Sequence, residues 1–189
     1  MCVHKRPKEV VMIDAKSYSP LDVEKAYDRR SYIYSKVISP LENHYHQVAI
    51  KEAQVQPGQK ILEVGTGPGS TFVELAGRVG ADEVIHGVDI SAKMLKLTAN
   101  RMERKGMGSF ELQKADCREL PFPDSTFDML YSAYLLDLIP QAEIPLVLAE
   151  FQRVLVPGGR LVLLNMSTAE NGWDWRESLY RWMPLQVSL

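Results

Sequence analysis

The chain has 189 residues and a formal net charge of −2, with 46% hydrophobic and 24% charged residues. This length suffices for one compact domain, and the balanced charge excludes the basic surface typical of nucleic-acid-binding proteins. Cys2 and Cys117 have neither metal-site nor redox-pair spacing, which favours a reducing, cytoplasmic location. The sequence holds no apolar run of the roughly 18 residues that an integral membrane segment needs, and its charged N-terminus is not typical of a secretory signal.

The first part of the chain is expected to be helical. Ser19-Pro20 and Ser39-Pro40-Leu41-Glu42 carry capping signals, with proline at the first helical position. Apolar residues at helical spacing follow the second signal, and Pro57-Gly58 closes the region with a turn. We therefore expect a single domain made of a helical cap at 1–56, a core at 57–166 and a helical segment at 167–189.

From residue 60 onward, strand and helix patterns alternate. Strands are expected at 60–65, 83–89, 109–116, 127–134 and 160–166. Helices are expected at 70–79, ended by Gly80, at 91–105, capped by Ser91 and stopped by Gly106, and at 144–155, before a turn at 156–159. This alternation predicts an α/β fold, a Rossmann-like doubly wound and mainly parallel sheet of about five strands. A ligand then binds at the carboxyl ends of the strands.

The glycine-rich stretch ILEVGTGPGSTFVELA follows the first expected strand. Gly65 allows a tight turn, Gly67 lets the backbone approach a ligand, and Gly69 lets the following helix pack close to the sheet. Such a turn also occurs as a plain connector. Asp89 and Asp116, at the ends of the next two strands, favour an adenosine pocket over two ordinary turn aspartates.

Glu63 lies two residues before the first glycine and bears on the choice of ligand. A carboxylate there is unfavourable for a pyrophosphate and suits a ligand with an ammonium or a sulfonium group. The turn also departs from the dinucleotide pattern, because Ser70 occupies its last position. Both features favour S-adenosylmethionine over NAD.

Four motifs in this order resemble the class I S-adenosylmethionine-dependent methyltransferases, most of all the ubiquinone/menaquinone-biosynthesis type. The motifs are LEVGTGPG, VDIS, ADCRELPFPDSTFD and LVPGGRLVLLN, and the resemblance covers residues 26–166. It implies that Glu63, Gly65, Thr66 and Gly67 hold the methionine end of the cofactor. It further implies that Asp89 binds the ribose, while Ile90 packs on the adenine. The remaining implied contacts are made by Asp116 and the backbone of Cys117 with the adenine, by Ser132 beneath the methionine, and by Tyr27 above the cofactor.

The resemblance implies direct attack by a substrate nucleophile on the sulfonium methyl group. Candidate bases are His44, His46, Tyr134 and Asp137. We interpret the two histidines as ordinary surface residues, we expect Cys117 to be a small pocket residue rather than a nucleophile, and we assign no catalytic residue. An apolar and aromatic wall suits a small lipophilic or aromatic acceptor, such as a quinone precursor or a lipid head group, although the same residues could form core. That wall comprises Tyr32, Tyr34, Tyr45, Tyr134, Leu135, Leu136 and Ile139.

The family usually continues after the fifth strand with a helix and an antiparallel hairpin. Here WDWRESLYRW can supply the helix, whereas the sequence shows no hairpin. The fifth strand is then expected to be a hydrophobic edge, covered by the C-terminal segment with Trp173, Trp175 and Trp182 or by a second copy in a homodimer, unless the chain is a shortened form. Two other functions stay open. One is a methyltransferase-like binding or interaction protein without turnover. The other, disfavoured by Glu63, is a nicotinamide-dependent oxidoreductase.

Overall fold

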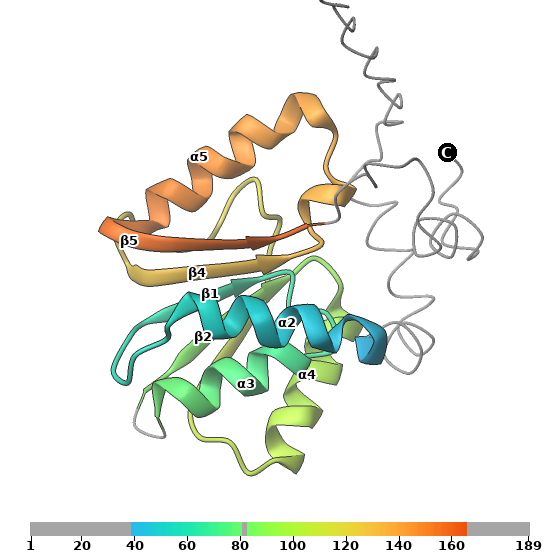
Figure 1. Cartoon of the computed structure of the whole chain (residues 1–189). Coiled ribbons are helices and arrows are strands. Elements are labelled where there is room, and N and C mark those ends of the chain that lie inside the picture. Colours follow the sequence, from blue (N-terminus) through green and yellow to red (C-terminus); the bar gives the residue numbers. More distant parts are fainter. Residues whose placement is uncertain (1–38, 81–82, 166–189) are drawn as a thin grey trace, which may run out of the picture.

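A computed structural model describes residues 39–80 and 83–165, which form a five-stranded parallel sheet with helices on both faces (Figure 1). The strand order is β3-β2-β1-β4-β5, and all neighbouring strands are parallel. The strands are β1 (Ile61–Val64), β2 (Ile85–Asp89), β3 (Phe110–Lys114), β4 (Phe127–Ala133) and β5 (Leu155–Leu164). The helices are α2 (Ser39–Ala53), α3 (Ser70–Val79), α4 (Ala92–Arg104) and α5 (Ile144–Val154). The predicted α/β, doubly wound fold is confirmed.

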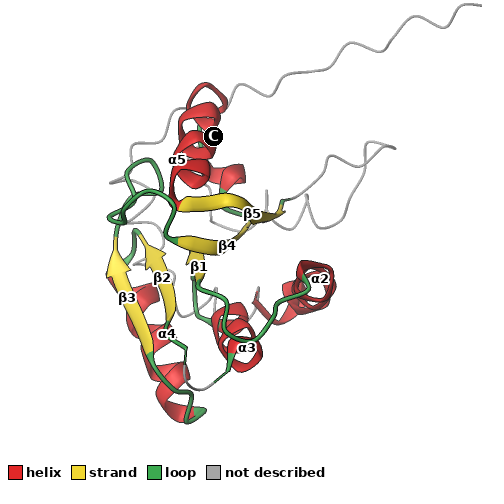
Figure 2. Ribbon diagram, turned by 90° about the vertical axis from the view of Figure 1, so that its left-hand side faces the viewer, coloured by secondary structure: helices red, strands yellow, loops and turns green. Residues whose placement is uncertain are grey.

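The two faces of the sheet are covered by different helices. In Figures 1 and 2, α5 lies on one side of the sheet, and α2, α3 and α4 lie on the other. Side chains alternate along β1 accordingly: Leu62 and Val64 pack with Phe151 of α5, whereas Ile61 packs with Phe72 of α3. The three central strands, β1, β2 and β4, are largely buried between these helices, so their carboxyl ends are held in fixed positions at one end of the sheet.

The helix boundaries follow the predicted signals. The Ser91 Oγ accepts a hydrogen bond from the Met94 N–H at 3.2 Å, so Ser91 caps α4 as expected. Gly80 follows α3 with a φ of +107°, and Gly106 follows α4 with a φ of +59°. Both values lie in the region that favours glycine, which explains why each helix ends there.

Three predicted boundaries after β2 were wrong. The helix expected to run through Leu155 ends at Val154, and β5 begins at Leu155 instead of Arg160. The turn expected at 156–159 is a bulge inside that strand, because β4 pairs with β5 first at Leu155 and then, after a register shift, at Arg160. The Pro-Gly-Gly residues are typical of a turn. They nevertheless lie within β5, because Leu155 before them already pairs with Phe127 of β4. Similarly, β3 ends at Lys114, so Asp116 follows the strand rather than ending it.

The outer edge of the sheet is formed by β5. Within residues 39–80 and 83–165, β5 pairs with β4 alone, and Leu161 and Leu163 are 38% and 37% exposed. None of the helices in these ranges is long and apolar enough to cross a membrane. The helix predicted at Ser19-Pro20 and the expected C-terminal helical segment lie outside the described residues.

Candidate functional site

A cavity lies at the carboxyl ends of β1 to β4, where the sequence predicted a ligand. One part of its wall comes from the ends of β1 and β2 and comprises Val64, Gly65, Gly67, Val88, Asp89 and Ile90. The segment after β3 adds Ala115, Asp116, Cys117 and Arg118. The end of β4 and the segment after it add Ala133, Tyr134, Leu135, Leu138 and Ile139. The charged members of this wall, Asp89, Asp116 and Arg118, all lie at the β2–β3 end.

Most of the predicted site residues meet at this cavity. Those that line it are Gly65, Gly67, Asp89, Ile90, Asp116 and Cys117. Glu63, Thr66 and Ser132 are buried next to lining residues and do not form part of the wall themselves. Tyr27 lies outside the described residues.

The glycine turn serves both the cavity and the packing of a helix. A Cβ on Gly67 would meet nothing within 4 Å, and its φ is +51°, so this glycine leaves open space at the wall. A Cβ on Gly69 would lie 2.8 Å from the Cα of Thr98. The missing side chain at Gly69 therefore allows α4 to pack close to the turn. The sequence had predicted that it allows the following helix, α3, to pack close to the sheet. Thr98 also donates a hydrogen bond from its Oγ1 to the Gly67 carbonyl at 2.9 Å, which fixes the turn.

Both carboxylate oxygens of Asp89 accept hydrogen bonds from backbone N–H groups. The Gly67 N–H donates to Oδ2 at 2.9 Å, and the Ser91 N–H donates to Oδ1 at 2.9 Å. These bonds orient the carboxylate at the cavity wall, where it is 9% exposed. A carboxylate at the cavity wall is the type of acceptor that ligand hydroxyls use.

Asp116 is held by Arg118, a residue that the sequence reasoning missed. Arg118 Nη1 donates to both oxygens of Asp116 at 2.9 and 3.0 Å, and its Nε donates to Glu143 Oε2 at 2.5 Å. The Arg118 side chain is 17% exposed, so this clamp is partly shielded from water. It ties the segment after β3 to Glu143, just before α5. The only sequence signal was a cation two residues after Asp116.

Glu63 has an unusual environment for a carboxyl group. It is 2% exposed, and its Oε2 is buried with no hydrogen-bond partner among the described residues. Burial, and then the charge of Asp89, raises its pKa well above the ordinary value. An unpartnered buried acceptor costs free energy unless a donor reaches it. This arrangement suits a cationic ligand group, and it disfavours a pyrophosphate.

The other predicted pocket residues have modest roles. Ser132 donates from its Oγ to the Val64 carbonyl at 2.9 Å, which links β4 to β1 beside the cavity. Burial, followed by the charge of Asp116, raises the pKa of the Cys117 thiol to about 12. Cys117 is therefore a neutral pocket residue, as predicted, because a thiolate is needed for nucleophilic attack. Among the described residues, no group of three His, Cys, Asp or Glu side chains could hold a metal ion.

The interpretation of His46 as a surface residue was wrong. His46 is half-buried, and its Nδ1 lies 3.1 Å from the Tyr131 hydroxyl and 3.0 Å from the Thr71 Oγ1. The sequence could not reveal this contact because Tyr131 is 85 positions away. Of the other candidate bases, Tyr134 lines the cavity and Asp137 is exposed. The side chain of His44 is outside the described part.

The predicted acceptor wall is formed in part. Tyr134, Leu135 and Ile139 line the cavity, while Leu136 packs against the core on the α5 side. Tyr45 is 40% exposed and does not line the cavity. Tyr32, Tyr34 and the three tryptophans lie outside the described residues. At the β4 end, the described wall is therefore aromatic and aliphatic.

The strand order, the glycine turn and the three acidic residues, Glu63 in β1, Asp89 at the end of β2 and Asp116 after β3, define the class I methyltransferase type of protein. Residues 61–159 match the family described as "Methyltransferase domain", and the chain belongs to this family. Membership in this class implies S-adenosylmethionine as the cofactor. Glu63, Asp89 and Asp116 fit that molecule, since it carries an ammonium, a ribose and an adenine.

Similar proteins support this assignment. A ubiquinone/menaquinone biosynthesis C-methyltransferase UbiE of Geotalea daltonii is 32% identical over 130 residues, which cover 68% of this chain and 54% of the relative. A demethylmenaquinone methyltransferase of Tropheryma whipplei is 35% identical over 145 residues, covering 77% and 56%. The chain thus spans about half the length of these curated relatives. An S-adenosylmethionine-dependent methyltransferase of Aquifex aeolicus shares the fold with a TM-score of 0.62, at 22% identity and 86% coverage of both chains.

Proposed function

We propose that this protein is an S-adenosylmethionine-dependent methyltransferase that acts on a small aromatic or lipophilic acceptor, such as a quinone precursor. The observation that carries the proposal is the buried Glu63, whose Oε2 lacks a hydrogen-bond partner among the described residues. The ammonium of the cofactor would supply the missing donor, directly or through a water molecule. Asp89 would accept from the ribose hydroxyls and Asp116 from the adenine amino group.

The cofactor supplies an electrophilic methyl carbon bonded to a sulfonium sulfur. In the proposed reaction, an electron pair of the acceptor forms a bond to that carbon. With the cofactor held by Glu63, Asp89 and Asp116, the carbon–sulfur bond would break with its electron pair left on sulfur, and the acceptor would release a proton. The protein's part is to position the two reactants and exclude water. Val64, Val88 and Leu135 supply apolar surface for this purpose.

The acceptor class has two supports. The relatives are named as methyltransferases of ubiquinone, menaquinone and related naphthoquinone synthesis. In addition, the cavity wall after β4 carries Tyr134, Leu135 and Ile139 and no charged side chain. Apolar surface of this kind favours a neutral ring over a charged head group.

Calorimetry tests the cofactor assignment. We expect S-adenosylhomocysteine to bind the full chain and NAD not to bind. Absence of S-adenosylhomocysteine binding would contradict the proposal. A methyl-transfer assay with quinols, phenols and phospholipid head groups then separates an enzyme from a binding protein without turnover, which would retain the cofactor and transfer nothing.

The exposed edge of β5 supports a second proposal, a homodimer formed through this edge. Leu161 and Leu163 present apolar surface on a strand that, within the described residues, pairs with β4 alone. Sedimentation equilibrium should then report a dimer, and Leu163→Lys should dissociate it. A monomer at all concentrations would contradict this proposal. A cytoplasmic location also stays a prediction, which fluorescence microscopy of a tagged chain can test.

A further inference from the structure

Tyr134 has a backbone conformation that is unusual for its residue type. Its φ is +55°, in the left-handed region where a bulky side chain is disfavoured by about 1 kcal/mol or more. The other described non-glycine residues with positive φ are Gln54 and Ser125, and neither lines the cavity. Tyr134 does line it. Strain retained at a cavity wall points to a function for the side chain placed there.

Tyr134 is held from two sides. Its N–H donates to the Leu164 carbonyl at 2.6 Å, which ties the backbone to β5. Its ring meets the His46 ring edge-on, with 5.6 Å between the ring centroids and an interplanar angle of 89°. This edge-to-face geometry is the favourable one for a pair of aromatic rings. The ring of Tyr134 is therefore fixed by a contact from α2.

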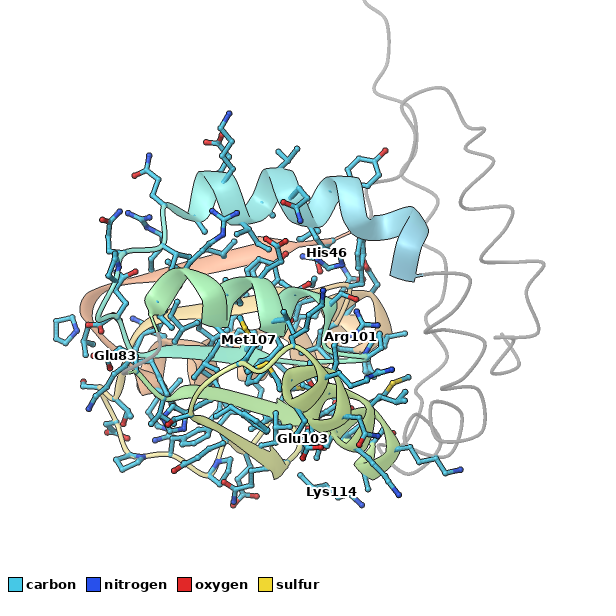
Figure 3. The ribbon with its side chains drawn as sticks, turned by 90° about the horizontal axis from the view of Figure 1, so that it is seen from below. His46, Glu83, Arg101, Glu103, Met107 and Lys114 are labelled. Carbon is cyan, nitrogen blue, oxygen red and sulfur yellow. The ribbon has the colours of Figure 1, made fainter. Side chains whose placement is uncertain are left out.

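His46 is held in turn by two hydroxyl groups from other elements. Tyr131 is on β4 and Thr71 is on α3, and Figure 3 shows His46 on the side of α2 that faces α3. Burial lowers the pKa of His46 to about 4, so the ring is neutral near pH 7. Burial, then the charges of Glu63 and Tyr134, raises the pKa of Tyr131, which keeps its hydroxyl proton. In the tautomer protonated at Nε2, the His46 Nδ1 has one lone pair, which accepts from one of these two hydroxyls at a time.

We propose that Tyr134 is the specificity-determining residue that packs against a flat aromatic acceptor, and that His46 is the positioning residue that keeps the Tyr134 ring at the cavity. This inference rests on the proposed methyl transfer and assigns its acceptor to the fused-ring or phenolic class. The charged wall residues, Asp89, Asp116 and Arg118, belong to the β2–β3 end. An acceptor at the β4 end therefore meets the Tyr134 ring and aliphatic side chains. Among the described residues at the β4 end of the wall, a phosphate-bearing head group would find no counter-charge.

The hydrogen bonds of His46 and its ring contact can be separated by two substitutions. His46→Asn offers an amide oxygen near the position of Nδ1, so it keeps an acceptor for Tyr131 and Thr71 and loses the ring. His46→Phe keeps the ring beside Tyr134 and leaves the hydroxyls without their acceptor. Thermal stability should therefore be lower in His46→Phe, which loses the hydrogen bonds. Acceptor affinity should be lower in His46→Asn, which loses the ring.

The test uses the full chain saturated with S-adenosylhomocysteine, titrated with 1-naphthol in a calorimeter. This phenol has a fused ring and does not react with thiols. We expect Tyr134→Leu and His46→Asn to weaken 1-naphthol binding by about tenfold and about fivefold, and Tyr134→Phe and His46→Phe to stay within about twofold. Affinity for S-adenosylhomocysteine should change by less than about twofold in both His46 variants, and by less than the 1-naphthol affinity in Tyr134→Leu. Val48→Gln, at a half-exposed position two residues along α2, is the matched control and should change neither affinity.

The outcomes separate this inference from the proposed function. If the wild-type chain binds no S-adenosylhomocysteine, the methyltransferase proposal itself is wrong. If it binds S-adenosylhomocysteine but not 1-naphthol, or binds phosphoethanolamine more tightly, the aromatic assignment is overturned. Unchanged 1-naphthol affinity in Tyr134→Leu overturns the role of Tyr134. An affinity that follows melting temperature across the His46 variants shows that His46 is only structural, and it overturns the positioning role.

Discussion

The acidic residues at the two ends of the cavity differ in the hydrogen bonds that the protein makes to them. At the β2–β3 end, Asp89 accepts from two backbone N–H groups, and Asp116 accepts from the Arg118 guanidinium. At the β1 end, Glu63 Oε2 is buried with no partner among the described residues. Carboxylates fixed by the protein are preorganised for a ligand, whereas an unpartnered one needs the ligand to complete its hydrogen bonding. The difference suggests that the adenosine end is built in advance and that the methionine end is completed by binding.

The largest expected effect is at Asp89. Asp89→Ala removes the proposed ribose acceptor together with the two bonds that order the glycine turn, so we expect at least about 100-fold weaker S-adenosylhomocysteine binding and a lower melting temperature. Asp89→Asn, which keeps one carbonyl acceptor, should fall between wild type and Asp89→Ala. Calorimetry and thermal unfolding measure both effects. Wild-type affinity in Asp89→Ala would remove Asp89 from the site.

The Arg118 clamp should have the next largest effect. Arg118→Met removes the two bonds from Nη1 to Asp116 and keeps the one from the backbone N–H of residue 118 to Oδ1, so the carboxylate is less firmly oriented. We expect about tenfold weaker S-adenosylhomocysteine binding. The analogue S-inosylhomocysteine lacks the adenine amino group, and its affinity should hardly change. Glu143→Gln, which weakens only the far side of the clamp, is the matched comparison and should cost about threefold. Equal losses for both ligands would show that Arg118 shapes the cavity without orienting Asp116.

Replacing Glu63 should raise the stability of the free protein, whereas replacing Asp89 should lower it. Glu63→Met removes a buried unpartnered carboxyl group, so we expect the free protein to be stabilised by about 1 kcal/mol while it loses cofactor affinity. Glu74→Met, at a partly exposed position on α3, is the control and should leave stability nearly unchanged. Urea unfolding without ligand measures the difference. A destabilised Glu63→Met variant would mean that the protein itself satisfies this carboxyl group.

The smallest effect concerns pH and His46. Its pKa falls from an ordinary 6.5 to about 4 in the folded protein, so the unfolded chain binds more protons between those values. Stability at this residue is therefore present above pH 6.5 and is lost as the pH falls toward 4. Between about pH 7 and pH 5.5, the loss is about 1 kcal/mol. Unfolding of His46→Asn should show a flatter dependence than wild type, and equal slopes would indicate that His46 titrates normally.

Local signals made most of the fold predictable from sequence. Ser91, Gly80 and Gly106 mark helix ends through their own backbone chemistry, and strand–helix alternation indicates a parallel sheet. The 156–159 bulge was missed because the same Pro-Gly-Gly signal is typical of a turn between elements. Only pairing with β4 shows that the strand continues through it.

The site residues that belong to local sequence motifs were predictable. Contacts between residues far apart in the sequence were not. Gly67, Asp89 and Asp116 stand in local motifs and line the cavity. The contact of Arg118 with Glu143 and that of His46 with Tyr131 join positions 25 and 85 apart. No periodicity or spacing encodes such pairs, since they arise only when the sheet brings the elements together.

The central claim is that Glu63 receives the ammonium of S-adenosylmethionine. The most direct measurement compares S-adenosylhomocysteine with methylthioadenosine, which lacks the amino acid, by calorimetry on wild type and Glu63→Gln. We predict that wild type prefers S-adenosylhomocysteine by at least about tenfold, and that Glu63→Gln loses most of this preference while its methylthioadenosine affinity stays unchanged. An equal loss for both ligands, or a preference that survives in Glu63→Gln, would contradict the claim.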